Sequence, residues 1–168
     1  MALGVGSANV ALGWQVVEES AMDLGTAKLT HTIGSMLSAM SNGTTDGTQI
    51  NRVWSDSGSV VNGAPVDLDL MGSLTSQLDG TTISFVDVVG VFIKYKSGTG
   101  DLTIGQGSNP WITWLAATGD GVVIGPNGVF VWFSPNGKSP TAGTGDILRL
   151  ASSSGTITYD IMIIGRSA

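Results

Sequence analysis

The side chains best suited to chemistry are few in this chain of 168 residues, and they are widely spaced. His31 is the single histidine and cysteine is absent, so a Ser-His-Asp triad or a histidine-bearing metal site would have to use His31. No carboxylate lies near His31 in the sequence, and we expect a packed or surface histidine there. We therefore assign no catalytic residue and expect no enzymatic activity.

The acidic residues are better explained by local structure than by a cation site. Asp67 and Asp69 form an Asp-x-Asp pair, but they alternate with Val66, Leu68 and Leu70 as the wet face of a half-buried strand would. The other aspartates in glycine-bearing turns do not match the spacing of an EF-hand. The Gly-x-Gly pairs lack the third glycine of a dinucleotide loop and the Lys-Ser/Thr of a P-loop. We expect neither a metal nor a cofactor.

Four aromatic residues are the candidates for a contact surface: Trp111, Trp114, Phe130 and Trp132. Residues 111–115 have the composition of a short strand, which would place Trp111 and Trp114 on opposite faces. One of the two would then face a neighbouring chain or a glycan, or lie under a loop. Aromatic residues are enriched in the cores of protein interfaces, which favours a subunit contact.

Residues 129–134 are almost entirely β-branched or aromatic, and the triplet Pro-Asn-Gly stands immediately before and after them. Each triplet predicts a turn, because proline fixes φ and glycine accepts a positive φ. The enclosed strand is apolar on both faces, with Val129, Val131 and Phe133 on one and Phe130 and Trp132 on the other. Such a strand is either central in a two-layer β structure or lies at a subunit contact.

The remaining elements predict a single all-β domain, an antiparallel β-sandwich of jelly-roll type. Residues 26–40 fit both a helical and a strand period, and their threonines together with Gly34 favour a strand. We expect an N-terminal arm or extension over residues 1–22 and the sandwich over residues 23–168. Further strands are expected at 14–17, 49–61, 66–70, 83–96, 102–104, 111–115, 122–124, 147–151 and 156–164, separated by turn signals.

Composition excludes several classes of partner. Charged residues are 12% of the chain and the formal net charge is −6, with seven scattered basic residues, so we expect no nucleic-acid binding. The apolar runs are far shorter than the ~20 residues of a membrane helix, and residues 1–12 are mildly apolar but contain no basic leader. We expect a soluble, unexported protein, and the absence of cysteine is compatible with assembly in a reducing cytoplasm.

Several segments together resemble a known family. They are GAPVDLDLMGSLT at 63–75, VFIK at 91–94, LTIG at 102–105, NPW at 109–111, PNGVF at 126–130, TAGTGDILRL at 141–150 and TITYDIMIIG at 156–165. The pattern resembles small virion structural proteins of tailed bacteriophages, in particular β-sandwich proteins that decorate or cement the capsid. The resemblance covers roughly residues 45–168 and carries no catalytic residue.

The resemblance implies a role in the virion and a set of partners. A capsid decoration or cement protein would be made in the host cytoplasm and would bind the outer capsid surface of the virion as a homotrimer, in contact with the major capsid protein or another virion protein. Closed rings of identical contacts would bury strands that are apolar on both faces. The alternative function is a tail-fibre or tail-tip module that binds host-surface glycans through Trp111, Trp114 or Trp132.

Overall fold

The residues that the structure describes form strands joined by turns and loops, and the all-β class is confirmed. The computed structural model describes the backbone of residues 7–22, 25–76 and 80–167, and side chains from residue 40 onward within these ranges. Its strands are β1 (Ser7–Met22), β2 (Gly25–Asn42), β3 (Gln49–Ile50), β4 (Arg52–Val61), β5 (Val66–Asp69), β6 (Leu74–Thr75), β7 (Thr82–Ile83), β8 (Asp87–Ser97), β9 (Leu102–Gly105), β10 (Gly121–Ile124), β11 (Val129–Lys138), β12 (Ile147–Ser152) and β13 (Thr156–Arg166). None of the described residues forms a helix that is long and apolar enough to cross a membrane.

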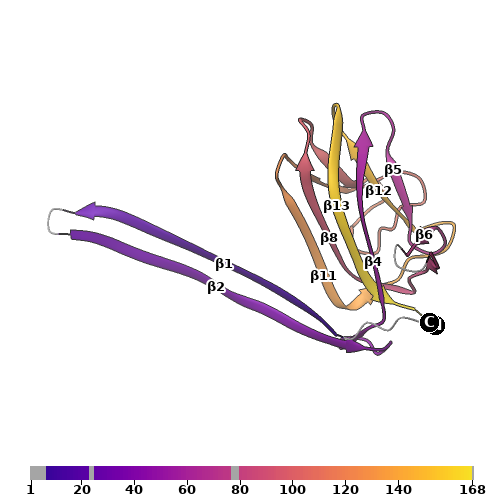
Figure 1. Cartoon of the computed structure of the whole chain (residues 1–168), viewed down its shortest axis with the longest axis horizontal. Coiled ribbons are helices and arrows are strands. Elements are labelled where there is room, and N and C mark those ends of the chain that lie inside the picture. The colour runs from indigo at the N-terminus through magenta and orange to yellow at the C-terminus, as the bar shows by residue number, and fades with distance from the viewer. Residues whose placement is uncertain (1–6, 23–24, 77–79, 168) are drawn as a thin grey trace.

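Two four-stranded antiparallel sheets make up a sandwich (Figure 1). One sheet has the strand order β11-β8-β13-β4, and the other has the order β10-β9-β12-β5. The strands β6 and β7 pair with each other in a small separate ribbon. Sheets of this kind are stable because each hides one apolar face against the other.

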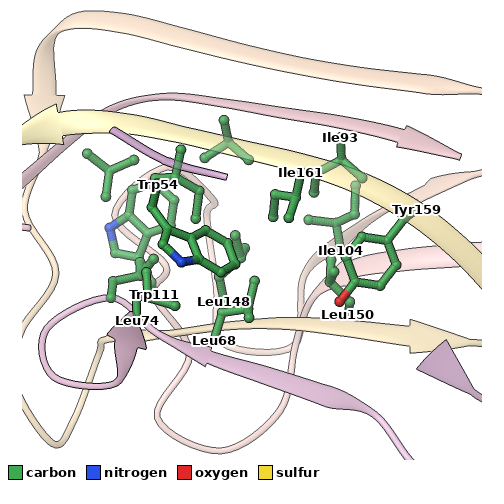
Figure 2. Packing of buried hydrophobic residues seen from close by; sticks show 14 of the residues in the cluster. Trp54, Leu68, Leu74, Ile93, Ile104, Trp111, Leu148, Leu150, Tyr159 and Ile161 are labelled. Atoms are coloured by element: carbon green, nitrogen blue, oxygen red, sulfur yellow. The ribbon is translucent and has the colours of Figure 1, made fainter. Parts of the chain in front are cut away.

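The core lies between the two sheets and follows the alternation of each strand. In β13 the buried residues Ile157, Tyr159, Ile161 and Ile163 alternate with more exposed ones. In β12 the buried residues Leu148 and Leu150 face them from the second sheet, as Figure 2 shows. Each buried aliphatic side chain contributes roughly 1.5–3 kcal/mol, so this layer supplies the main driving force for folding.

A long hairpin precedes the sandwich. β1 and β2 pair antiparallel from Ser7↔Ser41 to Met22↔Gly25, and they extend away from the two sheets (Figure 1). The preference for a strand over residues 26–40 is therefore confirmed. The boundary expected between residues 22 and 23 falls between the two strands of this hairpin, so residues 25–42 lie in the hairpin and not in either sandwich sheet. The side chain of His31, in β2, is outside the described residues.

Strand β11 lies at the edge of its sheet, not at the centre. The first triplet forms the expected turn, in which Gly128 N donates to Gly125 O over 2.9 Å and Asn127 has a φ of 62°. The second triplet does not end the strand as expected. It lies inside β11 as an irregularity between Phe133 and Lys138, because the chain bulges at Gly137, with a φ of 72°, and then pairs with β8 again.

Arg166, at the end of β13, joins the hairpin base to the sandwich. Its side chain is 1% exposed, and its guanidinium donates hydrogen bonds to three backbone carbonyls, those of Gln49 (3.3 Å), Pro135 (3.0 Å) and Asn136 (2.7 Å). Two carboxylates lie beside Nη2, Asp46 at 3.0 Å and Asp87 at 3.4 Å. One buried cation thus holds together the segment after the hairpin, the bulge of β11 and the start of β8.

We expect Arg166→Met to lower the free energy of unfolding by about 3 kcal/mol, because the carbonyls and Asp87 lose their donor in a buried site. Arg149→Met is the matched control. Arg149 pairs with Asp67 over 2.6 Å, but the side chains of both remain partly exposed, so its loss should cost about 1 kcal/mol or less. Urea denaturation followed by tryptophan fluorescence measures both. Equal losses in the two variants would contradict the role of Arg166.

Candidate assembly surfaces

The four aromatic residues singled out by the sequence come together in one cluster. The ring centroids of Trp111 and Trp132 are 5.4 Å apart with planes at 87°, and those of Trp111 and Trp114 are 5.7 Å apart. Trp114 also lies 5.5 Å from Phe130 and 6.1 Å from Trp132. We call these four residues the aromatic cluster. Phe130 and Trp132 come from the inner face of β11, and the two other tryptophans come from the loop between β9 and β10.

The expected strand at residues 111–115 does not form. The segment turns instead, with Leu115 N donating to Ile112 O and the indole Nε1 of Trp114 donating to Trp111 O, each over 2.8 Å. This turn places Trp111 and Trp114 on the same side, whereas a strand would have separated them. Pro110 before the segment and the Gly119-Asp120-Gly121 run after it are the sequence signals that favour a loop.

Members of the aromatic cluster differ in burial. Trp111 is 1% exposed and belongs to the main core, where its Nε1 has no hydrogen-bond partner among the described residues. Trp114, Phe130 and Trp132 are partly buried and pack against that core. The cluster therefore fixes the 106–120 loop over the edge strand β11, and its outer members border the molecular surface.

A second apolar surface covers the outer face of the sheet β11-β8-β13-β4. The strand register sets Val131 beside Phe92 and Phe92 beside Met162, in one row across three strands. Phe92 is 39% exposed, Met162 is 45% exposed, and Val129, on the same face of β11, is 51% exposed. We call Val129, Val131, Phe92 and Met162 the outer apolar row. Large apolar side chains grouped on one exposed sheet face are typical of a contact surface.

The outer apolar row continues into a small core at the base of the hairpin. Met40, Ile50, Val89 and Ile164 are buried together there, and Phe133 packs against them. Met40 belongs to β2 and Ile50 to β3, so the root of the hairpin covers one end of the same sheet face. The outer apolar row is the apolar part of that face that the hairpin root leaves uncovered.

Beside the outer apolar row lies a shallow, open hollow of about 490 Å³, lined by Phe92, Met162, Ser55, Ser57, Asp160 and their neighbours. Asp160 is held on its rim by a hydrogen bond from the hydroxyl of Ser57 and by an ion pair with Lys96 over 3.0 Å. These two interactions lower the pKa of Asp160 below its ordinary value. Lys94, also exposed on this face, adds a weaker attraction. The rim is charged, whereas the centre of the row is apolar.

The aspartates considered as cation ligands are occupied by structural contacts. Asp67 accepts two hydrogen bonds from Arg149, each of 2.6 Å, and Asp69 accepts one from Met71 N over 2.8 Å. Within the described residues no group of three or more acidic or histidine side chains is placed to hold a metal ion. The alternation predicted around them is present, with Leu68 buried and Asp67 exposed in β5.

Sequence reasoning did not single out Phe92 or Met162. The signal was present in the run 88–93, which is apolar at consecutive positions and therefore on both faces of a strand. Comparison of the sequence with protein-family models found no match, and a search of curated proteins found none either. The two apolar surfaces therefore carry the functional argument.

For the aromatic cluster we expect coupling between Trp114→Leu and Phe130→Leu. Aromatic pairs at this separation are worth ~0.5–1.5 kcal/mol beyond burial, so the double variant should lose less stability than the sum of the single losses by about that amount. A double-mutant cycle from urea denaturation measures the difference. The control cycle pairs Trp114→Leu with Val61→Ala, whose exposed side chain lies on β4, and should be additive. Additivity in both cycles would contradict the cluster.

For Asp160 we expect a carboxyl pKa below the usual value of ~3.9, measured by NMR titration of the folded protein. A lowered pKa in the folded state means that the stabilisation is present above the pKa of the unfolded chain and is lost as pH falls through the folded value. Lys96→Met should raise the pKa of Asp160, whereas Lys138→Met should leave it unchanged. A pKa at or above the usual value would count against this arrangement.

Proposed function

We propose that this chain is a non-enzymatic structural protein of a tailed-bacteriophage virion, a decoration or cement protein that binds the outer capsid shell as a homotrimer and stabilises it. The observation that carries the proposal is the outer apolar row. It exposes Phe92, Met162 and Val129 on a sheet whose other face is already buried in the core. A surface of this kind is stabilised when another protein surface covers it.

The architecture supports a role in assembly. The sandwich strands are joined by turns rich in hydrogen-bonding residues, and β11 presents apolar side chains on both faces at the edge of a sheet. Of the two uses considered for β11, a central position is excluded by the strand order, which leaves the subunit contact as the proposal. Major capsid protein or another virion protein would be the second partner.

We also propose jelly-roll connectivity for the sandwich. In chain order, the first to the eighth strand of the sandwich are β4, β5, β8, β9, β10, β11, β12 and β13. One sheet then has the order first, eighth, third, sixth, and the other has the order second, seventh, fourth, fifth. This alternation between sheets is the order expected of two interlocked Greek keys.

The alternative function, a glycan-binding module of a tail fibre or tail tip, has weaker support. A sugar-binding platform needs an open aromatic face, but Trp111 is buried. Trp114 and Trp132 pack against each other and against the core, with centroids 6.1 Å apart. Only their outer parts border the surface. A glycan array with the purified protein separates the two functions, since a decoration protein should show no saturable binding.

The direct test is a pair of cryo-EM maps, from virions produced with and without the gene for this chain. We expect density for the sandwich around local three-fold positions on the outer shell in the first map and its loss in the second. Shells that lack the protein should also open at lower temperature. Density in the tail, or no density, would overturn the capsid role. In solution, light scattering should give three times the chain mass of 17.2 kDa.

A further inference from the structure

The register of the hairpin separates its residue types into two faces. Residues at alternate positions of a strand share a face, and the cross-strand partner lies on the same face. One face carries Val10, Leu12, Trp14 and Val16 of β1, with Met36, Ile33 and Leu29 at or beside the paired positions of β2. The opposite face carries mostly polar types, including the pairs Gln15↔Thr32 and Glu19↔Lys28. The hairpin is therefore an amphipathic ribbon.

Met40 shows which body the apolar face of the hairpin meets. By register Met40 pairs with Ala8 and shares the face of Val10 and Leu12. Met40 is 1% exposed and packs with Val89 and Ile164 at one end of the sheet that bears the outer apolar row. The apolar face of the hairpin and the outer apolar row thus start from one shared cluster, and beyond it they diverge (Figure 1).

Within the described part of one chain, no element covers either surface. Among the described residues, β1 and β2 pair only with each other and with the short β3, so the ribbon lies outside both sandwich sheets. A two-stranded ribbon by itself is at best marginally stable in water. The 16 residues of β1 span roughly 50 Å, whereas the 11 residues of β13 span about 35 Å. The ribbon is therefore longer than the sheet that bears the outer apolar row.

We infer that the hairpin of one copy docks with its apolar face on the outer apolar row of a second copy. Within the chain, the root of the hairpin packs through Met40 on Val89 and Ile164, at one end of the same sheet face, and the hairpin of a second copy would cover the outer apolar row beside them. Charge agrees as well: Glu18 follows Val16 on the apolar face of the ribbon, and Lys94 stands on the sheet face beside Phe92. The inference rests on the self-association in the proposed function and names its contact.

The contact joins two different surfaces of the same chain. Head-to-tail contacts of this kind close into rings when the rotation between copies permits, which fits the proposed homotrimer. The sandwich would be the rigid part of each copy, and the hairpin would be the part that reaches the neighbour.

The experiment uses photo-crosslinking in the full-length chain, which has no native cysteine. The Val16→Cys variant is labelled with a benzophenone. It is then mixed with wild-type chain that carries no benzophenone and is uniformly enriched in nitrogen-15. We expect crosslinks from residue 16 to nitrogen-15 peptides that contain Phe92 or Met162. Gln15→Cys, one residue away on the opposite face by register, is the matched control and should give several-fold fewer crosslinks to these peptides.

A second pair of variants tests the receiving surface. Phe92→Glu in the nitrogen-15 chain should remove the crosslinks and shift the protein toward monomer, whereas Val123→Glu, on the 60% exposed position of β10, should do neither. Circular dichroism verifies that both variants remain folded. Crosslinks only within one chain, or equal yields from residues 15 and 16, would overturn the inference. An oligomer in light scattering that lacks these crosslinks would refute this contact and leave the proposed homotrimer standing.

Discussion

The buried guanidinium of Arg166 is the interaction on which the relation between hairpin and sandwich depends. A charged group at 1% exposure is tolerated only where hydrogen-bond acceptors replace water, and Arg166 meets three backbone carbonyls and two carboxylates. The planar fork of arginine can reach several acceptors at once, which the single ammonium of lysine could not do in the same geometry. Arg166 thereby fixes, at a single site, how the segment that follows the hairpin is placed against the sandwich.

The same arginine explains a local feature of the sequence. A Cβ at Gly137 would lie 2.6 Å from Nη2 of Arg166 and 2.8 Å from Cβ of Asp87, and the residue has a φ of 72°. Gly165, the neighbour of Arg166, is also constrained, because a Cβ there would clash with the backbone oxygen of Asp87. The second Pro-Asn-Gly triplet therefore predicts a turn from its residue types, but in the structure it forms a bulge, and the absence of a side chain at its glycine leaves space for the guanidinium of Arg166. Only the spatial neighbours distinguish the two outcomes.

Local pattern was sufficient for most strands of the sandwich, because one buried face leaves a period of two, as in β5 and β13. It was insufficient at residues 111–115, where the composition of a strand is overridden by a turn that Trp114 stabilises with its own indole N–H. The sequence also could not place β11 at an edge, since strand order depends on contacts distant in the chain. The sequence pointed to the four residues of the aromatic cluster because aromatic residues are enriched at interfaces, but it did not predict that they pack against one another. The sequence did not point to the outer apolar row, because Phe92 stands between Val91 and Ile93, and only the fold shows which of the three faces outward.

Charged residues are only 12% of this chain, so few are present to make a sheet face hydrophilic, and they are distributed unevenly. On the outer face of the sheet β11-β8-β13-β4, Lys94, Lys96 and Asp160 are grouped at one end, whereas the hairpin root covers the other. The apolar row lies between these two regions. If this exposure had no use, one more lysine or aspartate at position 92 or 162 would remove it without disturbing the core, because both side chains point away from the other sheet. The phenylalanine and methionine at these positions, together with a ribbon that has an apolar face of its own, fit the proposed contact between the hairpin and the outer apolar row.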